Sequence, residues 1–155
     1  NSLRSGIAED VDKLFKDLCL DTDKNKIGIG SVVVAKKPGD GSAREQAASC
    51  QKVLGGWANI AIEYATKRYR SNVINWGMVP FIIDKKDFEL FKLNDFIYIR
   101  GIKDTLESER EEISATLISG KEKREITLKL PLLTRNERKV ILAGCLINDY
   151  KDSSR

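Results

Sequence analysis

Ser42 and Arg44 are the residues of this 155-residue chain whose types and spacing could do chemistry. A serine hydroxyl can exchange a proton with a substrate, and the planar guanidinium of an arginine fits a carboxylate or a phosphate. Both follow directly after Gly39-Asp40-Gly41. Glycines at such a place let a ligand approach the backbone closely, which a plain helix cap does not require. The spacing therefore indicates a negatively charged ligand beside a serine hydroxyl.

The same residues predict the start of a helix. Ser42 stands at the expected N-cap, and Glu45 three residues later completes a capping box. The unpaired N–H groups and partial positive charge of a helix start attract anions. The alternative is that Ser42 only caps the helix and that Arg44 is a solvated first-turn side chain, since capping boxes are common.

The elements that must position these residues can be predicted from turn-forming residues and from the spacing of apolar residues. The apolar, β-branched run from Ile29 to Lys36 predicts a buried strand, and Gly55-Gly56 predicts the end of the helix. Further on, strands are expected at Trp57 to Tyr64 and at Met78 to Ile83, with a helix at Thr66 to Trp76 between them. Strand and helix alternate, so we expect a parallel sheet with helices packed against it.

The second half of the chain has a different character. Its expected elements are a short helix at Lys85 to Phe91, a strand at Phe96 to Arg100, a charged loop at Asp104 to Glu112, and a hairpin of Ile113 to Ile118 with Glu125 to Leu130. Thr134 and Glu137 form a second capping box, which starts a final helix expected to run to about Lys151. At the other end, Asn1 to Leu20 has the apolar spacing of an amphipathic helix.

Length and composition indicate one soluble domain, residues 1–155. The chain is 41% hydrophobic and 32% charged, with no run of roughly 20 apolar residues and no signal-peptide pattern. We therefore expect no membrane segment and a cytoplasmic location. The first residue, Asn1, is not methionine, so the chain is expected to be a piece of a larger enzyme or a processed product.

Three cysteines, Cys19, Cys50 and Cys145, are odd in number and widely scattered. They are expected to be small buried hydrophobic residues in a reducing compartment, and the chain has no C-x-x-C spacing for a metal or cluster. No metal site is predicted.

Lys67, Arg68 and Arg70 surround Tyr69, and such a basic-aromatic cluster can bind nucleic acid. The net charge of +4 is mild and the opposite charges are mixed, so a solvated helix face is the preferred interpretation and nucleic-acid binding is not expected.

Five segments together resemble the aconitase superfamily, specifically its mobile swivelling domain of the β/β/α type. Residues 39–48 (GDGSAREQAA) are similar to the family signature G-x-G-S-S-R-E-H-A-A. The other four matching segments are Leu54-Gly55-Gly56, residues 72–81 (NVINWGMVPF), residues 96–102 (FIYIRGI) and residues 143–148 (AGCLIN). Their order and approximate spacing agree over roughly three quarters of the chain.

The resemblance implies that this is the C-terminal swivelling domain of a hydro-lyase acting on a di- or tricarboxylic acid. In that family a [4Fe–4S] cluster, held by other domains, acts as a Lewis acid. Ser42 would be the base that removes the carbon-bound proton, and Arg44 would bind a substrate carboxylate. Arg4, in a short segment Ser2-Leu3-Arg4-Ser5, matches another substrate-binding arginine.

Two residues depart from the signature. Ala43 replaces the second serine and Gln46 replaces the histidine, so one hydroxyl contact to substrate at position 43 is missing and the substrate stays open. Two other interpretations also stay open. The chain could be the separate small subunit of an isopropylmalate isomerase-type enzyme, or a binding or regulatory module without catalysis, such as an RNA-binding one.

Overall fold

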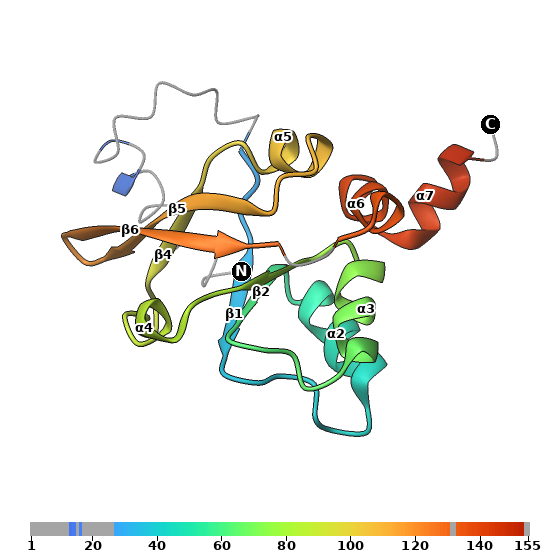
Figure 1. Cartoon of the computed structure of the whole chain (residues 1–155), viewed down its shortest axis with the longest axis horizontal. Coiled ribbons are helices and arrows are strands. Elements are labelled where there is room, and N and C mark those ends of the chain that lie inside the picture. Colours follow the sequence, from blue (N-terminus) through green and yellow to red (C-terminus); the bar gives the residue numbers. More distant parts are fainter. Residues whose placement is uncertain (1–12, 15, 17–26, 131–132, 154–155) are drawn as a thin grey trace.

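The structure is a computed structural model, and it describes residues 27–130 and 133–153, together with residues 13, 14 and 16. The described residues form one six-stranded mixed sheet with helices around it (Figure 1). The strands are β1 (Ser31–Ala35), β2 (Gly56–Ala61), β3 (Val79–Ile82), β4 (Phe96–Ile99), β5 (Glu112–Ser119) and β6 (Glu122–Lys129). The helices are α2 (Arg44–Val53), α3 (Lys67–Asn75), α4 (Lys85–Phe88), α5 (Ile102–Glu107), α6 (Arg135–Leu142) and α7 (Leu146–Ser153).

The sheet has the strand order β1-β2-β3-β6-β5-β4 and joins two differently built halves. The strands β1, β2 and β3 are parallel, as the alternation of strands and helices predicted. The other half is antiparallel and is built on the long β5–β6 hairpin. A single residue pair, Ile82 with Lys129, connects β3 to β6, and an ion pair of 2.7 Å between Lys129 Nζ and Asp84 Oδ1 lies beside it.

Two apolar cores hold the helices to the sheet. The larger core contains residues of both halves of the sheet together with Val140 and Ile141 of α6. The smaller core consists of Ala48, Tyr69, Val73 and Met78, and it lies between α2, α3 and the start of β3. In Figure 1, α2 and α3 lie next to each other on one side of the parallel strands, and the two helices also contact each other directly. The smaller core therefore supports the segment that carries Ser42.

Several predicted elements are confirmed and two are wrong. The three parallel strands, α3, α4, β4 and the hairpin occur within a few residues of their predicted bounds. The predicted burial of the first strand is not met, because β1 lies at the edge of the sheet and its residues are exposed or partly buried. The expected charged loop at Asp104 to Glu112 instead begins as the short helix α5, in which Thr105 and Leu106 are buried. The guanidinium of Arg138 donates hydrogen bonds to the carbonyl oxygens of both residues, so distant contacts stabilise a helix too short to show a periodic pattern.

The expected final helix is interrupted at Gly144. This residue has a φ of +85°, a left-handed conformation that ends α6, and α7 begins two residues later. The Gly144 backbone also packs on Gly77, where an added Cβ would meet the Gly144 carbonyl oxygen at 1.9 Å. The amphipathic helix expected at Asn1 to Leu20 lies almost entirely outside the described residues. Among the described helices, none is both long and apolar enough to cross a bilayer.

Candidate functional site

The loop that carries Ser42 leaves the carboxyl end of β1, at an edge of the sheet where parallel strands usually bind their ligands. The segment after β2 runs beside this loop. The backbone N–H of Glu63 donates to the Lys36 carbonyl at 3.2 Å, and that of Ala65 donates to the Pro38 carbonyl at 3.0 Å. The pairing of β1 with β2 thus continues into the loops that follow them and holds the first residues of the Ser42 loop in place.

Gly39 fixes the direction in which the loop then turns. Its φ is +95°, and a Cβ at this position would lie 2.5 Å from Cβ and Cγ of Tyr69. The carbonyl of Gly39 also accepts a hydrogen bond of 3.3 Å from Oγ1 of Thr66. The glycine is therefore required by close packing of the loop against α3. Gly41 is different, because a Cβ there would meet nothing within 4 Å.

Ser42 does not cap the helix, which corrects the predicted capping box. Helix α2 begins at Arg44, its N-cap is Ala43, and no side-chain cap is formed among the described residues. Since the helix starts one residue later than expected, its third residue is Gln46, and the three-residue spacing of Ser42 and Glu45 no longer fits the cap geometry. The side chains of Ser42 and Ala43 are exposed.

The missing cap leaves the start of α2 open. The first hydrogen bond of the helix runs from the N–H of Ala47 to the carbonyl of Ala43 at 3.0 Å. The N–H groups of Arg44, Glu45 and Gln46 come before it, so within the described part of the chain they have neither an intrahelical partner nor a side-chain cap. Such N–H groups, with the positive end of the helix dipole, form a binding place for an anion.

Arg44 is half-buried and lies next to this opening. Its Nε donates a hydrogen bond of 3.0 Å to the carbonyl of Gly41, which links the first helical residue to the preceding turn. This bond holds the guanidinium in place through one edge and leaves its two terminal amino groups able to bind a carboxylate. The structure thus brings Ser42, Arg44 and the open helix start together in one short segment. Arg4 lies outside the described residues.

Charged groups surround the loop. Nζ of Lys37 forms an exposed ion pair with Oε1 of Glu63 at 2.9 Å. The hydrogen bond that Lys37 donates to Glu63, and then the negative charge of Glu63, raise the pKa of Lys37. Lys37 is therefore engaged by Glu63, whereas Arg44 lies in the first turn of α2 beside the open N–H groups.

A buried polar network lies behind the loop, and the sequence pattern did not predict it. The hydroxyl of Tyr69 accepts hydrogen bonds from Nε2 of Gln51 at 2.8 Å and from Nδ2 of Asn59 at 2.9 Å. Tyr69 has 2% and Asn59 0% of its surface exposed. A tyrosine in a basic segment gives no sequence signal of such pairing, because its partners lie on other elements.

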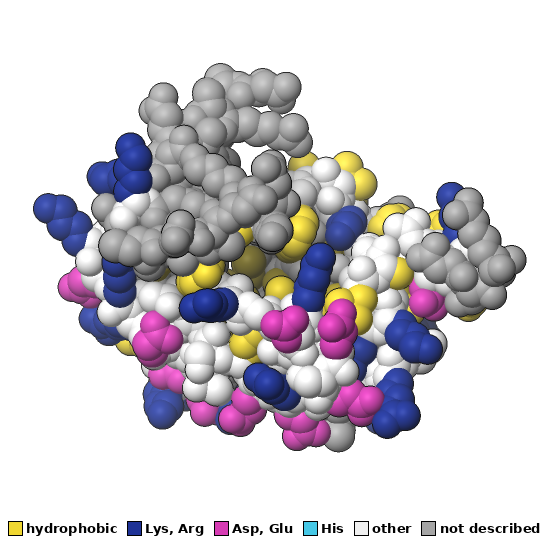
Figure 2. Space-filling view, turned by 90° about the horizontal axis from the view of Figure 1, so that it is seen from above, with side chains coloured by type: hydrophobic (Ala, Val, Ile, Leu, Met, Phe, Trp, Pro, Cys, Tyr) yellow, Lys and Arg dark blue, Asp and Glu magenta, His cyan; other side chains and the backbone are white. Residues whose placement is uncertain are grey.

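The basic segment itself departs from a nucleic-acid interface. Tyr69 is buried and its ring is not available to stack on a base, and Arg70 forms an ion pair of 3.1 Å with Glu137. Lys67 and Arg68 are exposed. On the coloured part of the face shown in Figure 2, both basic and acidic side chains are present.

The expectation that the cysteines are buried is wrong for the two that are described. Cys50 is exposed on α2 and Cys145 is half-buried in the turn before α7. Cys50 occupies the solvent side of its helix, which the apolar context of the sequence did not reveal. Within the described residues, no group of three or more histidine, cysteine, aspartate or glutamate side chains could hold a metal ion. Cys19 lies outside the described residues.

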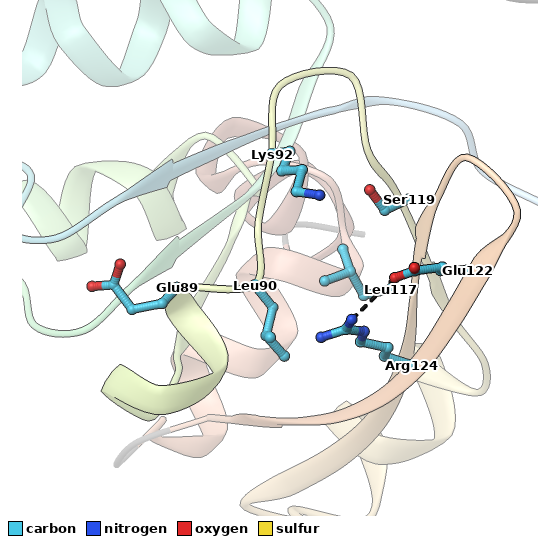
Figure 3. A pocket seen from close by; sticks show the side chains of 7 residues that line it. All are labelled: Glu89, Leu90, Lys92, Leu117, Ser119, Glu122 and Arg124. Carbon is cyan, nitrogen blue, oxygen red and sulfur yellow. Dashed lines mark hydrogen bonds and ion pairs between the residues drawn. The ribbon is translucent and has the colours of Figure 1, made fainter.

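A small surface pocket of about 140 Å³ lies elsewhere, between the end of α4 and the β5–β6 hairpin (Figure 3). It is lined by Glu89, Leu90, Lys92, Leu117, Ser119, Glu122 and Arg124. Arg124 pairs with Glu122 at 3.0 Å, and both side chains are more than half exposed. The pocket does not include the residues around Ser42.

Comparison with known proteins gives consistent matches. The family model of the aconitase C-terminal domain matches residues 4–86, just over half of the chain. The methanogen homoaconitase small subunit of Methanocaldococcus jannaschii is 35% identical over 127 residues, which cover 81% of this chain and 65% of that protein. Fungal proteins of Emericella nidulans and Aspergillus fumigatus, provisionally named mitochondrial aconitate hydratases, are 29% and 31% identical over 76% and 78% of this chain.

A solved structure also matches. The crystal structure of 3-isopropylmalate dehydratase from Methanocaldococcus jannaschii superposes with a TM-score of 0.57 and 29% identity, covering 84% of this chain and 68% of that chain. The present chain spans only 15% of the length of the two fungal relatives and 65% of the methanogen one.

Proposed function

The chain belongs to the family of aconitase C-terminal domains, and from this premise we propose that it supplies Ser42 and Arg44 to the active site of an aconitase-type hydro-lyase. The match to a solved structure confirms the predicted α/β fold of the swivelling domain. The observation that carries the proposal is the open start of α2, where exposed Ser42, half-buried Arg44 and N–H groups without a partner among the described residues lie together.

In this proposal each part of the segment has one task. Arg44 binds a carboxylate of a di- or tricarboxylic acid through the side of its guanidinium that faces away from Gly41. The first N–H groups of α2 bind oxygen atoms of the same substrate. Ser42, which is not engaged in a cap, takes the proton from the adjacent carbon. Ala43 contributes only backbone, so the substrate makes one hydroxyl contact fewer here than in the family signature.

The energies explain why the rest of the enzyme is needed. Each unit by which the pKa of a serine falls requires about 1.4 kcal/mol of differential stabilisation. A helix N-terminus supplies about 0.3–1 kcal/mol at an exposed site, which corresponds to less than one unit. Ser42 is exposed in this chain and should therefore behave as an ordinary alcohol. Neighbouring domains must exclude water and add donors before it can act as a base.

The described residues do not fit an iron–sulfur cluster, because they contain no group of three or more histidine, cysteine, aspartate or glutamate side chains that could hold a metal ion. We therefore assign the [4Fe–4S] cluster of the proposed enzyme to other domains or to a partner subunit, where it would supply a Lewis acid. A cytoplasmic location remains a prediction.

The separate small subunit is the second candidate. It is favoured by the 35% identity to the methanogen homoaconitase small subunit. The chain covers 65% of that protein but only 15% of each fungal protein. Sequencing the gene around this chain separates the two. A continuous reading frame with three cluster cysteines upstream supports the single-chain enzyme, and a stop codon between the two parts supports the small subunit.

The function is tested by turnover of citrate, isocitrate and isopropylmalate, first with this chain alone and then with its missing domains or subunit after cluster reconstitution. We expect no turnover by the chain alone and turnover by the assembled enzyme. Arg44→Lys should raise KM roughly tenfold or more, because a charge-assisted hydrogen bond contributes about 1.5–3 kcal/mol. Arg124→Lys, on the distant hairpin, is the control and should leave KM unchanged. Equal KM values for the two variants, or turnover by the chain alone, would contradict the proposal.

A further inference from the structure

Tyr69 connects the loop before α2 with three separate elements. Its ring forms the surface on which Gly39 packs, and the three atoms nearest to a Cβ at Gly39 all belong to Tyr69. Its hydroxyl binds Gln51 on α2 and Asn59 on β2, and its backbone N–H donates to Oγ1 of Thr66 at 3.2 Å. Oγ1 of Thr66 in turn donates to the Gly39 carbonyl. The buried side chain of Tyr69 on α3 thus contacts the loop, helix α2 and strand β2, the middle one of the three parallel strands.

We propose that Tyr69 is a positioning residue for Ser42 and Arg44, through its ring against Gly39 and its hydroxyl on Gln51 and Asn59. The loop leaves β1 next to Tyr69 and reaches Ser42 three residues after Gly39. Gln51 lies two helical turns after Arg44 on the same face of α2. The ring of Tyr69 therefore positions the loop at Gly39. The hydroxyl of Tyr69 positions α2 through Gln51. This inference rests on the proposed function for its effect on the reaction.

The hydroxyl is suited to this task because water does not compete for it. Both amide donors point at the same oxygen inside the protein, and Oε1 of Gln51 and Oδ1 of Asn59 are buried with no partner in the described part of the structure. Removing the hydroxyl would take this acceptor away from the buried amide of Asn59 and the part-buried amide of Gln51, and native proteins avoid unpaired buried N–H groups. Gln51 and Asn59 would then move to find new partners, and α2 would shift against the strand.

Tyr64 offers a matched control. Its hydroxyl also donates to buried acceptors, the carbonyls of Asn59 at 3.3 Å and Phe81 at 3.4 Å, and its ring centroid is 6.2 Å from that of Tyr69. Burial raises the pKa of Tyr64, so its hydroxyl stays neutral, as expected of a purely structural group. Tyr64→Phe therefore removes a comparable hydroxyl from the same core without removing a bond to α2.

The first measurement uses this chain alone and does not depend on activity. Backbone order parameters from 15N relaxation report fast motion, with values near 0.85 for rigid and below about 0.6 for flexible segments. In Tyr69→Phe, we expect the order parameters and amide shifts of residues 40–44 to change while those of the β5–β6 hairpin stay constant. In Tyr64→Phe, residues 40–44 should keep the wild-type values. Unchanged loop amides in Tyr69→Phe, or equal changes in both variants, would overturn the proposal.

The second measurement uses the assembled enzyme. Since small misplacement of reacting groups has large effects on rate, kcat of Tyr69→Phe should fall roughly tenfold, whereas kcat of Tyr64→Phe should stay within about twofold of wild type. Equal kcat values for the two variants would overturn the role of Tyr69 in the reaction. A failure of the proposed function is recognised separately: Ser42→Ala would then keep its turnover, whatever the loop amides of Tyr69→Phe show.

Discussion

Two helices of this protein begin with the same sequence pattern, and only one of them is capped by it. At the start of α6, Oγ1 of Thr134 accepts from the N–H of Glu137 at 3.2 Å, and Oε2 of Glu137 accepts from the N–H of Thr134 at 2.9 Å. At the start of α2, Ser42 and Glu45 have the same spacing but form no cap. The start of α6 is closed by its own side chains, and the start of α2 is open to a ligand.

The difference comes from where each helix begins. Thr134 is the N-cap of α6, so its partner three residues later is in the correct position. The loop before α2 is held by Gly39 against Tyr69 and by the bond from Arg44 to Gly41, and these contacts place Ala43 at the N-cap. Tertiary contacts thus override a local capping pattern. A capping sequence whose hydrogen bonds are not formed, because tertiary contacts shift the helix start, can therefore mark a helix start that binds a ligand.

The largest expected effect on stability concerns the closed end. Arg138 of α6 is 4% exposed, and its guanidinium donates to the carbonyls of Leu133, Thr105, Leu106 and Arg110. Arg138→Met should lower the free energy of unfolding by roughly 3 kcal/mol or more, because several buried carbonyls lose their partner. Urea denaturation measures this. Arg44→Met at the open end is the control and should lower it by about 1 kcal/mol or less, because the bond from Arg44 to Gly41 is exposed; equal losses would remove the distinction between the two ends.

A smaller effect separates the two glycines of the open end. Gly39→Ala should lower the free energy of unfolding by about 1–3 kcal/mol, because the added methyl meets Tyr69 and the backbone has a positive φ. Gly41→Ala should change it by less than about 0.5 kcal/mol, since there is open space around this residue. In the assembled enzyme Gly41→Ala should nevertheless raise KM, because the methyl group would lie where substrate approaches. An unchanged KM for Gly41→Ala would argue against close approach of a ligand.

The smallest effect compares the two hydroxyls directly. Thr134→Ala should lower the free energy of unfolding by about 1 kcal/mol, the usual cost of a lost N-cap. Ser42→Ala should leave it within about 0.5 kcal/mol of wild type, because Ser42 makes no cap. Thermal unfolding of the two variants side by side checks this. A stability loss in Ser42→Ala as large as that in Thr134→Ala would show that Ser42 caps α2 in solution.

Much of the fold could be predicted because its signals are local. The β-branched run around Val33, the glycines after α2 and the hairpin around Gly120 mark elements that the structure confirms. The helix α5 could not be predicted, because Arg138 stabilises it from a distant part of the chain. The break at Gly144 is a left-handed glycine turn whose backbone lies against Gly77, a contact that only the folded structure shows.

The geometry of the candidate segment could not be predicted from the sequence, and the roles of its residues remain a prediction. The spacing of Ser42 and Arg44 after two glycines indicated an anion beside a hydroxyl, and the structure places these residues in one segment. The capping role of Ser42 was wrong, since a shift of the helix start by one residue is set by packing on Tyr69. The network of Tyr69, Gln51 and Asn59 has no sequence signal, because its members come from three elements.

The most direct test of the central claim, that the open end of α2 is catalytic and the closed end of α6 is structural, is kcat of the assembled enzyme carrying Ser42→Ala or Thr134→Ala. A general base contributes roughly 10²–10⁴-fold to rate, so we expect kcat of Ser42→Ala to fall by that factor at unchanged stability. Thr134→Ala should keep the wild-type kcat at temperatures where the protein is folded. Wild-type kcat in Ser42→Ala would contradict the account.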